Sequence, residues 1–245
     1  MGIGIISGAS SGIGRALAFE FDLLGLDEIW LIARREEKLN EIKAKLKTPT
    51  KCLVLDLAED ASYNVIKEEI IKCGRKIEYL APCAGVGFTG TVESNTAEQI
   101  KGTVDLNCRA LTLLINTALP HMKDEGKIIN IASGAGFLPQ ADFAVYAASK
   151  AYVISLSRAL NKELKHKKIS VCAVCPGPVD TELFSKLENV KEYKKRYLIS
   201  PDLVAKKAMA ASRKGKAICT PTLSMKALRL CAKILPTALL IKLAK

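Results

Sequence analysis

Short apolar runs alternate with longer segments of helical periodicity along almost the whole chain. The apolar runs are nearly continuous, which is typical of strands buried on both faces of a parallel sheet. Alternation of such strands with helices predicts an α/β fold, a doubly wound parallel sheet with helices on both faces. About seven strands are expected, at residues 2–7, 28–33, 51–55, 77–81, 126–132, 169–175 and 217–220. Helices are expected at residues 12–24, 36–46, 58–73, 97–122, 146–164 and 201–212.

The composition is that of one folded domain. The chain has 245 residues, of which 49% are hydrophobic and 25% charged, and neither a linker nor an internal repeat divides it. Its formal net charge of +12 favours phosphorylated ligands, acidic substrates or anionic lipid surfaces. Nucleic-acid binding is not expected, because the chain has no basic arm and no stacking aromatic residues among its basic ones.

Eight cysteines need an explanation. The first strand candidate starts at Gly2 and leaves no room for a basic export leader, so we expect reduced cysteines in a cytoplasmic protein. The only Cys-x-x-Cys pair is Cys172 and Cys175, inside an apolar run. Residues three apart on a strand point to opposite faces, so this pair cannot chelate one metal ion, and no metal site is predicted.

The segment at residues 223–245 differs from the domain that we expect over residues 1–222. It is rich in Leu, Ala and Ile, and Lys226, Arg229 and Lys233 recur at helical spacing on one face. Pro236 breaks or kinks this helix, and with the charges it argues against a membrane-spanning segment. This amphipathic basic tail either packs on protein, in the same or a partner subunit, or contacts an anionic membrane. Packing on protein is the interpretation we favour.

A glycine-rich segment, Ser7-Gly8-Ala9-Ser10-Ser11-Gly12-Ile13-Gly14, follows the first strand and opens the first helix. Glycines there allow a tight turn and let the backbone approach a pyrophosphate, which then meets the positive end of the helix. The strand–turn–helix context separates this segment from an ordinary turn. We therefore predict a dinucleotide-binding turn made of Gly8, Ser10, Ser11, Gly12, Ile13 and Gly14.

The end of the second strand indicates which nicotinamide cofactor binds. An NAD site places an acidic residue there, which hydrogen-bonds the ribose 2′-hydroxyl. This chain instead has Arg34 and Arg35, and a guanidinium binds a 2′-phosphate through charge-assisted hydrogen bonds. NADP(H) is therefore predicted in preference to NAD(H). Asp56 and Leu57 follow the third strand, where Asp56 either hydrogen-bonds the adenine or caps the next helix.

Tyr146 and Lys150 are four residues apart at the start of a predicted helix, so they lie on one face, one turn apart. A phenol with a pKa of about 10 is a poor base at neutral pH, but a nearby ammonium favours phenolate and lowers that pKa. Tyr146 can then exchange a proton with an alkoxide or an alcohol. Ser133 supports this interpretation, because it ends the preceding strand and ligands bind at the carboxyl ends of strands in such sheets.

These motifs, in this order, resemble the short-chain dehydrogenase/reductase family over roughly residues 2–185. Residues 8–14 resemble the family's TGxxxGIG turn, which implies a single-domain Rossmann fold and an NAD(P)(H)-dependent oxidoreductase. The resemblance implies that Tyr146 is the acid/base, that Lys150 lowers its pKa and holds the nicotinamide ribose, and that Ser133 hydrogen-bonds the substrate oxygen. Asn107 resembles the fourth catalytic residue, which holds a proton-relaying water.

Two further segments bear on the cofactor. Residues 176–181 resemble the family's PG…T segment, which implies that the backbone of Pro176, Gly177 and Val179 and the side chain of Thr181 meet the nicotinamide. Pro82-Cys83-Ala84-Gly85 departs from the family's Asn-Asn-Ala-Gly, which puts local sheet stability and cofactor affinity in question. Ala84 and Gly85 still permit close approach to the adenine ribose.

The sequence therefore predicts an NADP(H)-dependent oxidoreductase that interconverts a hydrophobic ketone and a secondary alcohol. A homodimer or homotetramer through the helices at residues 107–122 and 146–164 is implied by the resemblance. The resemblance implies that residues 188–196 form a mobile basic lid, and an apolar substrate wall beneath it suits a substrate with an acidic group, such as a sterol acid or an acyl chain. The wall residues are Val86, Phe88, Leu138, Phe143 and Phe184. Two alternatives are a non-catalytic NADP(H)-binding regulatory or scaffold protein and a membrane-associated lipid or sterol reductase.

Overall fold

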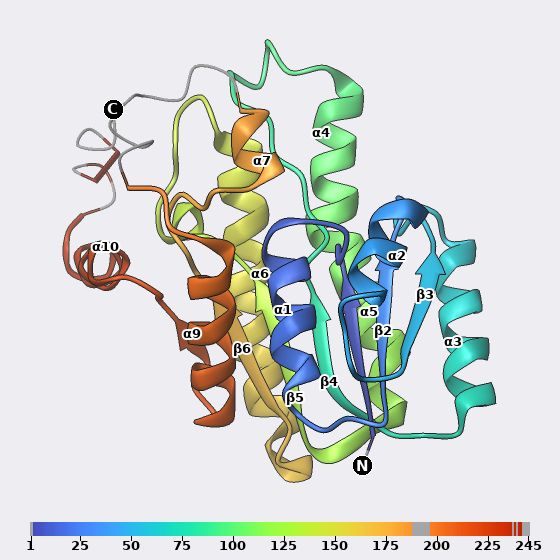
Figure 1. The fold of residues 1–245 in the computed structure, drawn as a ribbon. Coiled ribbons are helices and arrows are strands. Elements are labelled where there is room, and N and C mark those ends of the chain that lie inside the picture. The colour runs from blue at the N-terminus through green and yellow to red at the C-terminus, as the bar shows by residue number, and fades with distance from the viewer. Residues whose placement is uncertain (1, 188–196, 237, 239, 242–245) are drawn as a thin grey trace.

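The computed structural model describes residues 2–187, 197–236, 238, 240 and 241. Within them, seven parallel strands form one sheet in the order β3-β2-β1-β4-β5-β6-β7, so the predicted doubly wound sheet is confirmed (Figure 1). The strand order reverses between β1 and β4, which in such sheets marks the ligand-binding edge. The strands are β1 (Ile3–Ser7), β2 (Glu28–Ala33), β3 (Thr50–Val54), β4 (Ile77–Pro82), β5 (Met122–Ile131), β6 (Ser170–Val174) and β7 (Ile218–Cys219).

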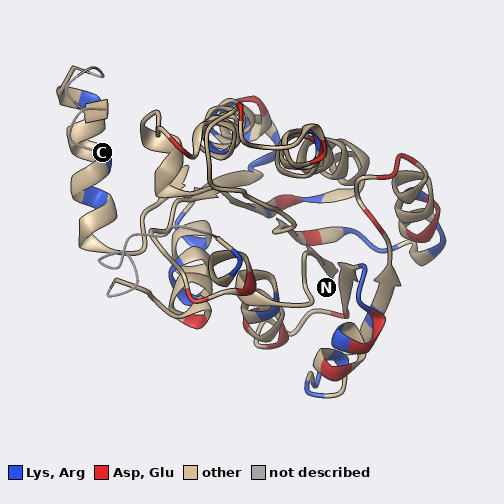
Figure 2. Cartoon of the chain, turned by 90° about the horizontal axis from the view of Figure 1, so that it is seen from above, with Lys and Arg blue, Asp and Glu red and all other residues tan. Residues whose placement is uncertain are grey.

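Helices cover both faces of the sheet, as Figure 2 shows from above. One hydrophobic core lies under α1 (Gly12–Asp22), α2 (Glu36–Lys43) and α9 (Pro201–Arg213). The other lies under α3 (Ala61–Cys73), α5 (Leu111–Ala118) and α6 (Ala144–Glu163). Successive strand residues alternate between the cores: Ile29 and Leu31 join the first, Trp30 and Ile32 the second. Both faces of a strand are thus apolar, which accounts for the continuous apolar runs.

Shorter elements surround this frame. α4 (Ala97–Val104) is joined to α5 by a π-helical turn (Asp105–Ala110), and 3₁₀ turns occur at Leu119–His121, Gly134–Phe137 and Leu164–Lys167. α7 (Glu182–Ser185) follows β6, and α10 (Leu223–Ile234) follows β7. α10 stands apart at the β7 edge of the molecule in both views (Figures 1 and 2).

The single helix predicted over residues 97–122 is wrong. The chain changes from α to π geometry at Asp105, and Pro120 lies in a 3₁₀ turn that ends the helical segment. β5 then starts at Met122, four residues before the predicted strand, because Met122 pairs with Ile77 across a bulge. Glu125 within that bulge has a φ of 66°. Hydrophobic periodicity does not encode this change of helix type or the bulge.

The Pro82-Cys83 departure does not interrupt the pairing of β4 with β1. Ser7 pairs with Pro82, and the Ser7 hydroxyl accepts hydrogen bonds from the backbone N–H groups of Cys83 and Ala84, at 3.1 and 3.3 Å. Because Ser7 is only 1% exposed, both bonds form away from water. The hydroxyl that opens the glycine turn therefore also holds the segment after β4.

Cys172 and Cys175 lie in the cores on opposite faces of the sheet, as predicted from their spacing. All eight cysteines are free thiols, and only Cys231 is exposed. Among the described residues, no three His, Cys, Asp or Glu side chains gather as a metal site would require. No helix in the described parts of the chain is both long enough and apolar enough to span a bilayer.

Candidate active site

The glycine turn lies between β1 and α1 at the carboxyl edge of the sheet, which is the upper edge in Figure 1. Gly8 and Gly12 have φ angles of 63° and 54°, in the left-handed region that favours glycine. A Cβ on Gly8 would lie 2.7 Å from the Ala84 nitrogen, and one on Gly12 would lie 3.0 Å from Cγ2 of Thr181. The turn is therefore in contact with two other predicted cofactor segments.

The start of α1 fits a pyrophosphate. Ser11 is the N-cap residue, and its side chain does not cap the helix. The first N–H groups of a helix have no intrahelical partner and bind phosphate groups. A Cβ on Gly14 would lie 2.4 Å from the Gly8 carbonyl oxygen. Only glycine at this position therefore lets the first turn of α1, which carries Ile13, lie this close to the backbone of Gly8. The residues present therefore fit a dinucleotide.

Arg34 and Arg35 follow β2 and face different partners. Arg34 is largely exposed, with one guanidinium nitrogen 3.4 Å from an Asp56 carboxylate oxygen. Arg35 donates to the Ser10 hydroxyl at 3.0 Å and pairs with Glu182 at 2.8 Å. Arg35 thus connects the glycine turn to the first residue of α7, a link between segments far apart in the sequence.

A pocket of about 460 Å³ opens next to the glycine turn, between α1, α2, α7 and the start of α9. Three basic side chains, Arg15, Lys38 and Lys45, face it together with the hydroxyls of Ser10 and Ser11. The rest of the lining is Gly12, Glu41, Ile42, Asp180, Thr181, Glu182, Ser185 and Pro201. Three of the lining residues are acidic and Lys38 is paired with Glu41 at 2.9 Å, so Arg15, Lys45 and the two hydroxyls are the groups that suit a phosphorylated ligand.

Asp56 and Leu57 follow β3 as predicted, but Asp56 is not a helix cap. α3 begins at Ala61 with Asp60 as its N-cap residue, and the Asp56 carboxylate instead accepts the N–H of Ala58 at 2.9 Å in a local turn. Leu57 is buried, and its carbonyl accepts the Tyr63 hydroxyl at 2.6 Å. The adenine interpretation of Asp56 therefore remains as a prediction.

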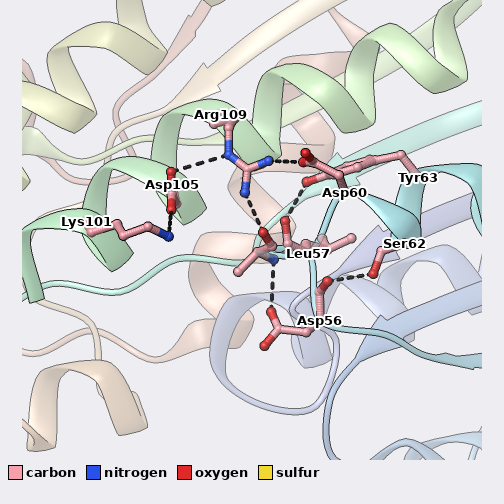
Figure 3. A network of polar contacts seen from close by, with 9 residues as sticks. Asp56, Leu57, Asp60, Ser62, Tyr63, Lys101, Asp105 and Arg109 are labelled. Carbon is pink, nitrogen blue, oxygen red and sulfur yellow. Dashed lines mark hydrogen bonds and ion pairs between the residues drawn. The ribbon is translucent and has the colours of Figure 1, made fainter. Parts of the chain in front are cut away.

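Arg109 joins this loop to the π-helical turn (Figure 3). Its guanidinium donates to the Asp105 carboxylate at 3.3 Å, to the Asp60 carboxylate and to the Ala58 carbonyl. Lys101 also donates to Asp105, at 2.7 Å, and these bonds hold the pKa of the Asp105 carboxyl below its usual value. The π turn that carries Asn107 is thereby fixed to the loop after β3.

Tyr146 lies buried near the start of α6, 9% exposed. Its ring stacks on Phe143, with centroids 4.3 Å apart and 20° between the planes. Gly87 also approaches the ring so closely that a Cβ there would lie 2.5 Å from it. Burial raises the pKa of Tyr146 to about 12, against a smaller lowering by its hydrogen bond with Ser133. Ser133 and Tyr146 are thus brought together as predicted.

Lys150 is also buried, and its ammonium donates to the Ile131 carbonyl at 3.0 Å. Its Nζ lies 5.5 Å from the centroid of the Tyr146 ring. Burial lowers the pKa of Lys150 to about 8. The net pKa of Tyr146 is thus raised and not lowered as predicted, because the loss of solvation on burial dominates; a lowering by Lys150 stays a prediction.

Asn107 lies inside the π turn, 1% exposed. Its amide oxygen accepts the Val86 N–H at 2.9 Å, and its nitrogen donates to the Val86 carbonyl at 2.8 Å and to the Ser149 hydroxyl at 2.9 Å. A Cβ on Gly85 would lie 3.0 Å from this amide oxygen and 3.5 Å from Nζ of Lys150. Asn107, Lys150 and the Gly85 backbone therefore meet, and one lone pair of the amide oxygen is left for a water.

Two residues of this site were not identified from the sequence. Ser149 donates to the Tyr146 carbonyl at 2.7 Å while accepting from Asn107, so it connects α6 to the π turn. Gly87 leaves room for the Tyr146 ring. The second glycine in Gly85-Val86-Gly87 was the available signal for Gly87, whereas nothing in the sequence marked Ser149 beyond its place between Tyr146 and Lys150.

The Pro176–Thr181 segment borders the site from the β6 side. The Pro176 carbonyl accepts the N–H of Gly134 at 2.8 Å, beside Ser133. Thr181 is the N-cap of α7, a helix not predicted, and its hydroxyl accepts the N–H of Phe184 at 3.3 Å. Val179 is buried and bridges Ile199.

The predicted substrate wall is partly described. Leu138 is buried, Val86, Phe143 and Phe184 are half-buried, and Phe88 is 37% exposed. The predicted lid at residues 188–196 lies outside the described residues. 

The tail contributes a contact that the sequence did not indicate. Met225 of α10 packs against the loop after β5 and against Gly177, since its sulfur would lie 2.4 Å from a Cβ on Gly134 and 3.5 Å from one on Gly177. α10 therefore borders the site next to Ser133.

An open parallel sheet with a glycine turn after β1 and a buried Ser–Tyr–Lys cluster defines a class of nucleotide-dependent enzymes. Residues 3–192 match the short chain dehydrogenase family, so the chain belongs to this family and is an oxidoreductase.

Similar proteins agree with this assignment. An uncharacterised oxidoreductase of Staphylococcus epidermidis is 32% identical over 183 residues, which cover 74% of this chain and 79% of that protein. Human 17-beta-hydroxysteroid dehydrogenase type 3 is 31% identical over 187 residues, covering 73% of this chain and 59% of that longer protein.

Two solved structures with this fold carry different cofactors. A short-chain dehydrogenase from Sphingobium yanoikuyae in complex with NADPH has a TM-score of 0.82 at 28% identity, covering 95% of this chain and 94% of that one. A 3-ketoacyl-(acyl-carrier-protein) reductase from Brucella melitensis, complexed with NADH, has a TM-score of 0.78 at 25% identity, covering 89% and 94%.

Proposed function

We propose that this oxidoreductase uses NADP(H) to interconvert a hydrophobic ketone and its secondary alcohol, with Asn107, Ser133, Tyr146 and Lys150 as the catalytic residues. One observation carries the proposal. The Tyr146 hydroxyl is hydrogen-bonded to Ser133, and the Lys150 ammonium and the Asn107 amide meet at Gly85, two residues from Gly87, which contacts the same tyrosine.

A nicotinamide cofactor supplies the hydride in reduction and accepts it in oxidation. In reduction, Tyr146 donates its hydroxyl proton to the carbonyl oxygen, while the Ser133 hydroxyl hydrogen-bonds the same oxygen and orients it. A pKa of about 12 keeps Tyr146 protonated at neutral pH, the state that proton donation needs. Lys150, with a water held by Asn107, returns the proton to the phenolate.

Arg34 and Arg35 support NADP(H) over NAD(H). The Arg35 guanidinium donates to Ser10 in the glycine turn, the Arg34 guanidinium lies at Asp56 in the loop after β3, and the pocket that Arg15 and Lys45 face opens next to the turn. Two charge-bearing groups at this point suit a 2′-phosphate. The solved relatives use either cofactor, so the support comes from these residues of the chain itself.

The apolar residues near Tyr146 support a hydrophobic substrate. Phe143 stacks on the catalytic ring, Leu138 in the same loop is buried, and Val86 after β4 and Phe184 in α7 are half-buried. A relative that is named a hydroxysteroid dehydrogenase is consistent with a bulky apolar ketone. We include an acidic group on the substrate in the proposal because the chain carries a net charge of +12.

A cofactor-dependent substrate screen tests the proposal. Purified protein with NADPH is offered sterol ketones, acyl ketones and small sugar ketones, and loss of NADPH absorbance is followed. We expect turnover with the apolar ketones and little with the sugars. NADPH binding without turnover of any ketone or secondary alcohol would favour the regulatory or scaffold alternative, and preference for small neutral sugars would contradict the hydrophobic substrate.

The proposal also covers the oligomeric state, the cellular location and the domain organisation of the enzyme. We propose a homodimer or homotetramer through the helices at residues 107–122 and 146–164, in the cytoplasm, with residues 223–245 as a tail distinct from the domain at residues 1–222. Sedimentation equilibrium measures the oligomeric state, and a monomer at all concentrations would contradict it.

A further inference from the structure

The exposed side of α10 is unusual, because this helix has two apolar faces. Met225, Leu228 and Ala232 recur at intervals of three and four residues, are half-buried and form the face toward the protein. A second apolar stripe, Leu223, Ala227, Leu230, Cys231 and Ile234, also recurs at helical spacing and faces outward. Leu223, Leu230 and Ile234 are 78%, 59% and 69% exposed. Packing on the protein accounts for the first face only.

A basic stripe lies between the two apolar faces. It consists of Lys226, Arg229 and Lys233, and no ion pair joins these side chains to any acidic residue in the described parts of the chain. A shallow pocket of about 290 Å³ beside this stripe is lined by the same three residues with Thr220 and Leu230. Among the described residues these basic groups therefore have no acidic partner, and they gather at one concave place.

The surrounding sequence is strongly basic as well. After Asp202 the chain contains ten Lys or Arg residues and no Asp or Glu. In Figure 2 the helix at the C-terminal end carries only blue and tan segments and projects from the body of the molecule. A surface that combines an exposed apolar stripe with unpaired positive charge is complementary to an anionic lipid interface.

We propose that α10 binds the surface of an anionic lipid membrane, with Leu223, Leu230 and Ile234 buried among the acyl chains and Lys226, Arg229 and Lys233 at the phosphate groups. The helix lies in the plane of the interface and does not cross it. Because Met225 on its inner face contacts the loop beside Ser133, this contact brings the catalytic edge of the sheet close to the membrane. A second copy of the chain is the competing occupant of the outer stripe.

Vesicle flotation tests the charge requirement. The full-length protein is mixed with phosphatidylcholine vesicles, with or without phosphatidylglycerol, and the fraction that floats is measured. The variant K226Q/R229Q/K233Q is compared with K67Q/K72Q/K162Q, which removes equal charge from exposed positions on α3 and α6. We expect binding only to the anionic vesicles, and partitioning reduced at least about tenfold in the α10 variant but not in its control.

A second pair of variants tests the apolar stripe. L223Q/L230Q removes side chains that are 78% and 59% exposed, and L23Q/I71Q removes side chains that are 76% and 58% exposed elsewhere. Only the α10 pair should lose vesicle binding. The emission of a solvatochromic fluorophore attached to Cys231, the exposed thiol, should shift to the blue with anionic vesicles. The Cys231→Ser protein, treated in the same way, shows how much of the signal comes from labelling of other thiols.

Circular dichroism and thermal melting confirm that each variant is folded, which is expected because every substituted side chain is exposed or half-buried. The proposal is overturned if the wild type does not float with anionic vesicles, if it floats equally with neutral ones, or if the α10 variants float like their controls. A dimer that dissociates in L223Q/L230Q, without vesicle binding by the wild type, would assign the stripe to a second copy. None of these readouts depends on turnover, so they are independent of the proposed reaction.

Discussion

Tyr146 and Lys150 are two titratable groups whose burial moves their pKa values apart, to about 12 for Tyr146 and about 8 for Lys150. Burial disfavours the charged form of each, so it raises the pKa of the phenol and lowers the pKa of the ammonium. At neutral pH the tyrosine is therefore protonated, and the lysine is close enough to its pKa to exchange a proton. The first property suits donation of a proton to a carbonyl oxygen, and the second suits the return of a proton to the tyrosine afterwards.

These values predict a pH dependence. Reduction needs the proton of Tyr146 and the proton of Lys150, so kcat/KM for a ketone should fall as pH rises through about 8, where Lys150 loses its charge. Oxidation needs a base and should rise over the same range. The measurement is a pair of pH–rate profiles with saturating cofactor. A reductive profile that stays flat well above that pH would contradict the role of Lys150. Because arginine stays charged, any residual activity of Lys150→Arg should not fall over this pH range.

Gly87 is required for the position of the catalytic ring. A Cβ there would lie 2.5 Å from Tyr146, so Gly87→Ala should displace the ring and reduce turnover by ~10-fold or more, because small misplacements of reacting groups are costly. Steady-state kinetics measure the effect. Gly102→Ala in α4 is the matched control, since nothing lies within 4 Å of its Cβ and alanine favours a helix. Wild-type turnover by Gly87→Ala would show that the ring has no fixed position.

At the scale of elements, the π turn between α4 and α5 is central to the site, because it carries Asn107 on one side and Arg109 on the other. Asn107 holds Val86 and Ser149, while Arg109 holds the loop after β3. A π turn changes the direction of side chains relative to a regular helix and often occurs at functional sites. The turn thereby connects the catalytic residues with the segment predicted to meet the adenine.

Removing the Arg109 connection should loosen this loop. Arg109→Met loses the bonds to Asp60, Asp105 and the Ala58 carbonyl, and the free energy of unfolding should fall by about 1 kcal/mol, mainly through the lost bond to the carbonyl. Lys101→Met, which loses only a contact of an exposed side chain with Asp105, should cost less. Urea denaturation measures both. Equal stability of the two variants would mean that Arg109 makes no distinct contribution.

The elements that hydrophobic periodicity predicted best are those buried on both faces. β2 spans residues 28–33 as predicted, and β1, β3, β4, β6 and β7 differ from the prediction by one residue at one or both ends. The π turn, the early start of β5 and α7 were missed, because they depend on contacts distant in sequence: Asn107 with Val86, Met122 with Ile77, and Glu182 with Arg35.

The same limit applies to the site. The motif spacing brought Tyr146, Lys150 and Ser133 to one place correctly, since strand ends and helical periodicity determine where these residues lie. It gave the wrong direction for the pKa of Tyr146, because burial by Phe143 and Gly87 cannot be predicted from spacing. The alternative that Asp56 caps the next helix is wrong, because α3 begins later, at Ala61.

At the scale of the whole molecule, the doubly wound sheet places the glycine turn, the arginines after β2 and the Ser–Tyr–Lys cluster along one edge. The basic pocket beside α2 lies near the glycine turn, and the basic tail lies at the β7 edge. Basic side chains thus line two separate places, one beside the proposed cofactor site and one on the helix proposed to meet lipid phosphate groups.

Cofactor preference should be visible in the stability of the whole protein. A ligand that binds only the folded state raises the Tm, so NADPH should raise it more than NADH at equal concentration. In Arg34→Ser/Arg35→Ser this difference should disappear, while Arg75→Ser, which replaces an exposed arginine elsewhere, should keep it. Differential scanning fluorimetry measures these shifts. An equal or larger shift with NADH in the wild type would contradict the preference for NADP(H).

The central claim is that the Tyr146 hydroxyl transfers the proton in a cofactor-dependent reduction. The most direct measurement is ketone-dependent NADPH oxidation by Tyr146→Phe, with NADPH affinity determined in parallel by fluorescence titration. Because phenylalanine retains the stacking on Phe143 and loses only the hydroxyl, we predict a fall in kcat of about a hundredfold or more with NADPH binding preserved. A variant that keeps most of the wild-type turnover would contradict the mechanism.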